Sequence, residues 1–229
     1  RPDMWANLIE SEARDGYGLI LKGRVNDIGY KSVCAPANLK MYYEAHKEHG
    51  KLPWSRIVEP AIAWAEGGCT VRPHVHYWWS DDGAFGRAPN HERVTFTRTA
   101  RDLYCRADGT PKRVGDRVVN RDYGQTLRAI AIGGAEVFYT GEIAAAIAED
   151  MKKNGALLTA EDLKSWRPVR NQPLWGDYRG YKVSTNQPPG GGVMLIEMLN
   201  ILAPSALSSM EHGSAQYLRV VGEAMKRAT

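Results

Sequence analysis

The chain has 229 residues, of which 43% are hydrophobic and 24% charged, so it is long enough for one large domain with its own core. Its 30 basic and 26 acidic residues leave a net charge of +4, an excess too small and too scattered to indicate nucleic-acid binding. No apolar run approaches the length of a membrane span.

The first predicted element is a helix over Pro2–Glu12, because a proline is tolerated in the first turn of a helix. Its apolar residues fall on one side: Trp5, Leu8 and Ile9. Leu19–Leu21 is predicted as a short strand, and Tyr30–Pro36 as an extended or looped segment. Arg1 stands where a native start would have Met, so we expect the front of the protein to lie upstream.

Two helices are predicted next, over Ala37–His49 and Ser55–Glu66, each followed by glycine. Val71–Asn90 is interpreted as a variable surface loop or lid with aromatic packing. Arg98–Val119 is polar and rich in turn signals. Asn120 is then predicted to cap a helix that runs to Ile132. The apolar face of that helix is predicted to carry Tyr123, Leu127 and Ile130.

Two helices are also predicted within Val137–Trp166. Thr140 is expected to cap the first, and Asn154-Gly155 to end it in the left-handed conformation. An apolar stripe repeats along it every four residues: Ile143, Ile147 and Met151. Thr159 and Asp162 form a near capping box that opens the second, short helix.

Alternating polar and apolar residues over Pro173–Val183 predict a β-hairpin or two strands. The glycine-rich turn Gln187–Gly192 follows, and no Gly-Lys-Ser/Thr completes a phosphate cradle there. We expect the turn's glycines to adopt backbone angles that other residues avoid. A last helix over Ser214–Arg227 is predicted to bury four apolar residues: Tyr217, Leu218, Val221 and Met225.

A histidine cluster is the first candidate for chemistry. His74, His76 and His91 could bind a metal, and the carboxylates of Asp81 and Asp82 could join them. His74 and His76 would share a face only on a strand, and no fixed-spacing partner follows. We therefore predict no metal and no cofactor.

Cysteine chemistry is the second candidate. Cys34, Cys69 and Cys105 are widely spaced, so they indicate neither a disulfide framework nor a zinc finger. Cys34 with His46 or His49 could imitate a cysteine hydrolase, but a buried structural cysteine is the preferred interpretation. The carboxylate pairs, Asp81-Asp82 and Glu149-Asp150, are predicted to be solvated. No Gly-x-Ser-x-Gly nucleophile motif occurs.

Several motifs in a fixed order resemble the large subunit of the γ-glutamyltranspeptidase family. They lie in these segments: Ser32–Pro36, Ala45–Trp54, Pro60–Gly68, Thr126–Ala131, Phe138–Gly141, Asn154–Leu163, Pro173–Tyr181 and Gly191–Leu202. The sequence departs from the family at Ala35 and Ala37, which replace glycines, and at Pro189-Gly190, which replaces paired serines. The resemblance covers residues 32–225.

The resemblance implies an α+β fold of the N-terminal nucleophile hydrolase class, a four-layer αββα sandwich. In it, residues 1–229 would be a single large-subunit domain that supplies mainly helices and some strands. Family members cut one precursor into two subunits, and the cut frees a threonine at the start of the small subunit. That threonine attacks a γ-glutamyl amide, and water or an amino acid or peptide accepts the glutamyl group.

The resemblance therefore implies that the partners of this chain are the small subunit and a γ-glutamyl small molecule. It places no catalytic residue here. The family's carboxylate-binding arginine belongs to an Arg-Glu-x-Ala-Pro motif, which neither Arg1 nor Arg14 matches. Two alternatives remain: an acylase acting on a β-lactam side chain or on poly-γ-glutamate, and a non-catalytic binding protein. A periplasmic or extracellular location follows from the resemblance alone, so the compartment stays open.

Overall fold

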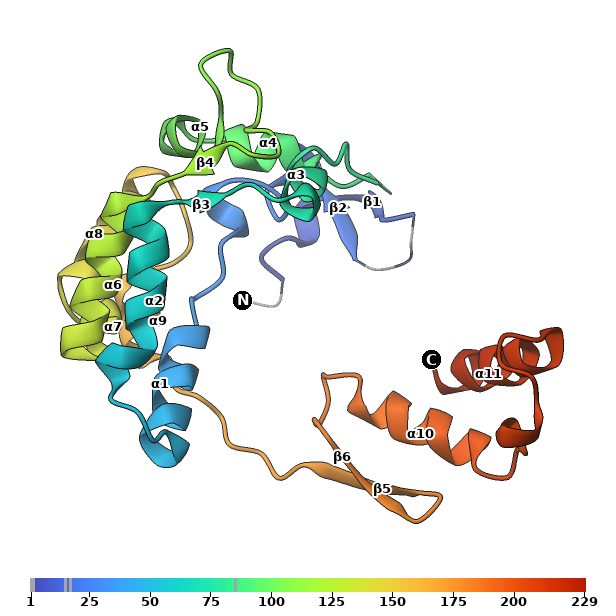
Figure 1. The fold of residues 1–229 in the computed structure, drawn as a ribbon. Helices are drawn as coiled ribbons and strands as arrows, with labels where there is room; N and C mark the ends of the chain where they lie inside the picture. The colour runs from blue at the N-terminus through green and yellow to red at the C-terminus, as the bar shows by residue number, and fades with distance from the viewer. Residues whose placement is uncertain (1–2, 15, 17, 85) are drawn as a thin grey trace. The chain divides into compact units, whose positions relative to one another are not determined.

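A computed structural model describes residues 3–14, 16, 18–84 and 86–229 (Figure 1). Helices dominate, and the described strands pair in two-stranded antiparallel ladders, which confirms the predicted α+β class. The chain divides into two compact units, Arg1–Pro168 and Val169–Thr229. A single domain over residues 1–229 stays a prediction. None of the helices in the described residues is both long and apolar enough to cross a membrane.

The predicted helix over Pro2–Glu12 is wrong within the described residues, which exclude Pro2. A 3₁₀ turn at Ala6–Leu8 leads into strand β1 (Ile9–Glu12), which pairs with β2 (Leu19–Leu21). The ladder forms in place of the helix because strand pairing satisfies backbone N–H and C=O groups that a short, fraying helix would leave without hydrogen bonds. Strand β2 was predicted correctly.

Three predicted helices form the scaffold of the first unit: α1 (Asn38–His49), α2 (Trp54–Gly67) and α6 (Arg121–Gly133). The Asn120 side chain caps α6 by accepting a hydrogen bond from the Tyr123 amide at 2.9 Å, as predicted. Helices α2 and α6 pack through a buried apolar cluster: Val58, Ile62 and Leu127. Tyr123, in contrast with its predicted place on the apolar face, is 53% exposed.

Residues 69–119 hold more regular structure than predicted. The described part, residues 69–84 and 86–119, contains three helices and a short ladder: α3 (Pro73–Trp79), α4 (Asn90–Thr95), α5 (Arg98–Tyr104), and β3 (Cys69–Thr70) paired with β4 (Arg117–Val118). Helix α3 begins with a proline at its first position, where a proline is favoured. Helix α5 is capped by the Thr97 hydroxyl, which accepts a hydrogen bond from the Ala100 amide at 3.0 Å.

The helical pair of Val137–Trp166 is confirmed, with one correction. Its helices are α8 (Glu142–Lys153) and α9 (Ala160–Ser165), preceded by the short α7 (Glu136–Tyr139). Thr140 does not cap α8, because its hydroxyl donates instead to the Glu136 carbonyl at 3.0 Å. Gly155 ends α8 at a φ of 67°, and Thr159 and Asp162 form a complete capping box.

The second unit begins with the predicted hairpin, β5 (Leu174–Tyr178) and β6 (Tyr181–Thr185). Helices α10 (Gly192–Leu202) and α11 (Ala215–Ala228) follow and pack on each other. The predicted buried face of α11 is wrong in part, since Leu218 is 59% and Met225 52% exposed. Two alanines are buried instead, Ala224 and Ala228, because small residues let two helices approach closely.

Candidate functional site

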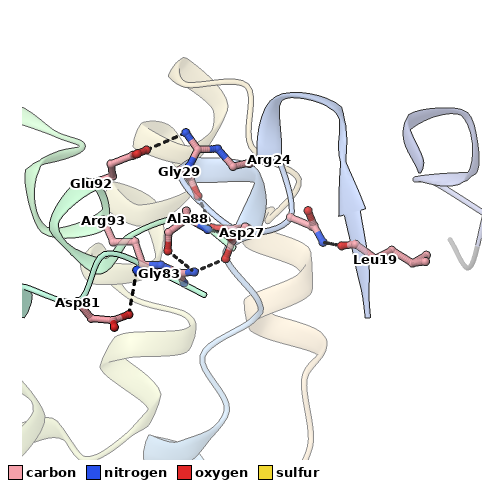
Figure 2. A network of polar contacts seen from close by, with 11 residues as sticks. Leu19, Arg24, Asp27, Gly29, Asp81, Gly83, Ala88, Glu92 and Arg93 are labelled. Atoms are coloured by element: carbon pink, nitrogen blue, oxygen red, sulfur yellow. Dashed lines mark hydrogen bonds and ion pairs between the residues drawn. The ribbon is translucent and has the colours of Figure 1, made fainter. Parts of the chain in front are cut away.

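A polar junction, here named the Asp27 junction, ties the segment after β2 to α4 (Figure 2). The Asp27 carboxylate accepts hydrogen bonds from the Ala88 amide and from the Arg93 guanidinium. Arg24 forms an ion pair with Glu92 at 2.8 Å. Both Asp27 oxygens are therefore committed to structural partners, and the junction positions chain segments rather than offering a free carboxylate.

Two cavities adjoin this junction and the segment that follows it. One, of about 360 Å³, is lined by Asp27, Tyr30, Arg93, Phe96 and Met151 among others. The other, of about 790 Å³, is lined by Met4, Trp5, Lys31, Cys34 and Asp162 among others. Burial, and then the neighbouring Asp150 carboxylate, raise the pKa of Tyr30. Tyr30 is thus held as the neutral phenol, which is not the state of a general base.

The structure does not place any of the three cysteines as an activated nucleophile. Cys34 and Cys69 are exposed, which makes the prediction of a buried Cys34 wrong. Cys34 precedes α1, whereas His46 and His49 lie in its last turn, and about 12 Å of helix separates Asn38 from His46. Cys105 is buried, and burial raises the pKa of its thiol, so it stays protonated near neutral pH.

The histidine imidazoles do not converge on one site. On α3, His74 and His76 point to nearly opposite faces, because residues two positions apart are rotated by about 200° around the axis of an α-helix. His76 Nδ1 lies 3.2 Å from the Lys112 carbonyl, and His91 Nδ1 lies 3.9 Å from the Asp82 carboxylate. Among the described residues, no three His, Cys, Asp or Glu side chains are close enough to hold a metal ion. The absence of a metal and the lid interpretation stay predictions.

The remaining candidate residues lie apart from one another. Glu149 and Asp150 are exposed on α8, which confirms their predicted solvated face. Asp81 is half-buried and accepts a hydrogen bond from the Gly83 amide at 3.2 Å. Arg14 is exposed, and Arg1 lies outside the described residues.

Two of the family-like motifs, Phe138–Gly141 and Asn154–Leu163, contribute to a packed cluster rather than to a cleft. The cluster, named here the Tyr139 cluster, consists of Ala135, Tyr139, Ala144, Leu158 and Leu163. The Tyr139 hydroxyl donates to the Pro36 carbonyl at 2.7 Å and accepts from the Lys40 amide at 3.1 Å. It therefore joins the motif at Ser32–Pro36 to the motif at Phe138–Gly141.

Sequence reasoning missed a buried cation beside this cluster. The Lys40 side chain is only 8% exposed, and its Nζ lies 3.0 Å from the Glu136 carboxylate and 5.2 Å from the centroid of the Tyr139 ring. The local spacing suggests Glu44, four residues on in α1, as the partner of Lys40, but Glu44 pairs with Lys47 instead. The pair fixes α1 against α7.

The glycine-rich turn before α10 is shaped by space rather than by backbone angle. Gly190, Gly191 and Gly192 all keep negative φ, so the predicted unusual angles are wrong. A Cβ at Gly192 would collide with the Asn186 carbonyl and lie 2.5 Å from the Thr185 hydroxyl oxygen. A Cβ at Gly191 would meet only the end of the Met194 side chain, at 3.2 Å.

Comparison with known proteins decides which family these features belong to. The family model described as Gamma-glutamyltranspeptidase matches residues 14–229. The chain belongs to the γ-glutamyltranspeptidase family. It is 34% identical over 197 residues to the glutathione hydrolase proenzyme of Escherichia coli K12, across 84% of this chain and 32% of that protein.

An acylase is similarly related. The chain is 32% identical over 209 residues to the Acylase ACY 1 proenzyme of Pseudomonas sp. strain SE83, across 90% of this chain and 36% of that protein. The chain thus spans about a third of the length of these two relatives, at 32% and 36%.

The crystal structure of the Helicobacter pylori γ-glutamyltranspeptidase matches at a TM-score of 0.83 and 27% identity, over 99% of this chain and 60% of that chain. This match confirms the predicted N-terminal nucleophile hydrolase fold. It also agrees with the geometry above, in which the family motifs build the scaffold.

Proposed function

We propose that this chain is the large-subunit part of an enzyme that cleaves γ-glutamyl amides and transfers the glutamyl group to water, an amino acid or a peptide. The observation that carries the proposal is the family match over residues 14–229, supported by similarity to a protein named as a glutathione hydrolase proenzyme. The Tyr139 cluster supports that match, because motif residues that are far apart in sequence are in contact there.

The chemistry would use a threonine freed at the start of a small subunit when the precursor is cut. The threonine oxygen attacks the amide carbonyl carbon, and its own α-amino group takes the hydroxyl proton. The C–N bond then breaks, and the departing amine leaves with that proton. Water or an acceptor amine attacks the resulting ester and restores the threonine. Hydrogen-bond donors aimed at the developing oxyanion stabilise both tetrahedral stages.

The role of this chain in that reaction is to build and hold the scaffold. Its cysteines, histidines and exposed carboxylates are dispersed among the described residues. The Ser80 hydroxyl lies 3.5 Å from His76 Nδ1, a long contact, and the same nitrogen lies 3.2 Å from the Lys112 carbonyl. This dispersal supports placing the nucleophile outside residues 1–229.

An acylase is the second candidate function, because the similarity to the Acylase ACY 1 proenzyme covers 90% of this chain at 32% identity. The two candidates share the fold and the attacking threonine, and they differ in the acyl group. A γ-glutamyl group carries an α-amino group that a glutaryl group lacks, so a site built to pair with that ammonium should discriminate between them.

The test compares two anilides on the purified full-length protein, beside a denaturing gel that records precursor cleavage. We expect cleavage into two chains and faster release of nitroaniline from γ-glutamyl-4-nitroanilide than from glutaryl-4-nitroanilide. The reverse preference would assign an acylase. An uncut precursor without activity on either anilide would support the non-catalytic alternative and contradict the proposal.

A further inference from the structure

An apolar pocket, here named the aromatic pocket, opens between α2, α3, α5, α6 and the β3–β4 ladder. Its volume is about 350 Å³. The side chains that define it are Trp64, Cys69, Val71, Trp79, Tyr104 and Tyr123. Neither the candidate chemistry nor the Tyr139 cluster uses these six side chains. The pocket is therefore a separate feature of the first unit.

The floor of the aromatic pocket is fixed by backbone hydrogen bonds. Val71 is 2% exposed, its amide donates to the Asp116 carbonyl at 2.8 Å, and its carbonyl accepts from the Gly115 amide at 3.0 Å. The Asn120 amide donates to the Ala65 carbonyl at 2.9 Å and joins the start of α6 to the end of α2. A floor tied in this way is formed before any ligand arrives, which lowers the ordering cost of binding.

Aromatic rings form the walls and the rim. Trp79 and Tyr104 pack edge to face, with ring centroids 5.3 Å apart and planes at 63°. Trp64 and Tyr123 stand at the rim and are 60% and 53% exposed, although large aromatic side chains are favoured in the interior. Their exposed faces can stack on, or meet the edge of, another ring.

The lining also sets the charge of the ligand. Among the described residues that line the pocket there is no Asp, Glu, Lys, Arg or His, and the polar groups are a thiol, two phenols, two indole N–H groups, a threonine and an asparagine. A charged ligand would lose hydration there without gaining a counter-charge. The space lies near the lower end of the range for small-molecule pockets and is walled by five elements, which favours a small molecule over a flat protein surface.

We propose that the aromatic pocket binds an uncharged small molecule that carries a planar aromatic ring. The ring lies against Trp64 and Tyr123, above the floor formed by Val71. This binding is independent of the amide chemistry proposed above, because none of the pocket residues takes part in that reaction.

Calorimetric titration of the full-length protein with indole tests this proposal. Indole-3-acetate, a negatively charged analogue of indole, serves as the control ligand. We expect indole to bind and the carboxylate to bind at least about tenfold more weakly. Trp64→Ala should weaken indole binding at least about fivefold, because it removes one stacking face. Trp175→Ala is the matched control, since Trp175 is 62% exposed and is not one of the residues that line the pocket, and it should leave the affinity within about twofold.

A second measurement keeps the native pocket and uses Cys69 as a reporter. In a Cys34→Ser variant, Cys69 is the exposed thiol of the chain, since Cys105 is buried. Indole should slow alkylation of Cys69 by N-ethylmaleimide by about threefold or more, and indole-3-acetate should not. Absence of both calorimetric binding and protection would overturn the proposal. So would indole binding of equal affinity in the Trp64→Ala variant.

Discussion

The Tyr139 cluster and the aromatic pocket use aromatic side chains in opposite ways. Tyr139 is 1% exposed, and its hydroxyl is bonded to Pro36 and Lys40. Trp64 is 60% exposed at the edge of an open space. Most residues of the Tyr139 cluster lie in or beside family-like motifs, and Trp64 lies within one too, the segment Pro60–Gly68. The difference teaches that one family motif can serve both environments, since Ile62 of Pro60–Gly68 is buried and Trp64 of the same segment is exposed.

The largest expected effect of this difference is on stability. Tyr139→Ala should lower the free energy of unfolding of the full-length protein by about 3–5 kcal/mol, because it leaves a cavity in a closed cluster. Tyr139→Phe should cost about 1–3 kcal/mol, because it leaves the Pro36 carbonyl and the Lys40 amide without their partner. Trp64→Ala should cost less than about 1 kcal/mol. Urea denaturation measures the unfolding free energy of all three variants. Equal losses in Tyr139→Ala and Trp64→Ala would contradict the difference between the closed cluster and the open pocket.

The glycine turn before α10 extends the comparison to a second tightly packed place. Gly192→Ala should cost about 1–3 kcal/mol, because its Cβ would collide with the Asn186 carbonyl. Gly191→Ala should stay within about 0.5 kcal/mol, because the Met194 side chain can move away. Thermal denaturation of the two variants decides this, and a Gly191 variant that is the less stable of the pair would contradict the packing account.

The smallest expected effect is at the capping box of α9. The Thr159 hydroxyl, and then the Thr159 amide, hold the pKa of Asp162 below its ordinary value. A lowered folded pKa gives stability that is present above the unfolded pKa of about 3.9 and is lost as pH falls through the folded pKa. Thr159→Ala should cost about 1 kcal/mol near neutral pH and flatten the loss of stability below about pH 4. Urea midpoints measured from pH 7 to pH 2.5 test this; an unchanged acid profile would exclude this role for Asp162.

Local signals predicted much of the fold, and competing contacts explain the failures. Gly155 and the Thr159 capping box carry their own hydrogen bonds, so their effect is readable from a few residues. Thr140 had a competing acceptor in the Glu136 carbonyl, which belongs to an unpredicted helix. Strand β1 was missed because its pairing with β2 is a contact between separated segments, which apolar spacing does not reveal.

The functional features were harder to predict for the same reason. The aromatic pocket is assembled from five elements between Ala61 and Tyr123, and no short motif marks it. The pairing of Lys40 with Glu136 joins residues 96 positions apart, so neither position indicates the other. The motif resemblance, by contrast, predicted the family correctly, because several motifs stand in a fixed order along the chain and can be recognised without knowing which residues are in contact.

The central claim is that residues 1–229 supply the scaffold and that the nucleophile lies elsewhere. The most direct test is a cysteine-free chain in the full-length protein: Cys34→Ser, Cys69→Ser and Cys105→Ala together. The account predicts normal precursor cleavage on a gel and turnover of the preferred anilide within about threefold of the parent protein. A variant that is cleaved normally and yet loses all turnover would place the chemistry on this chain and contradict the account.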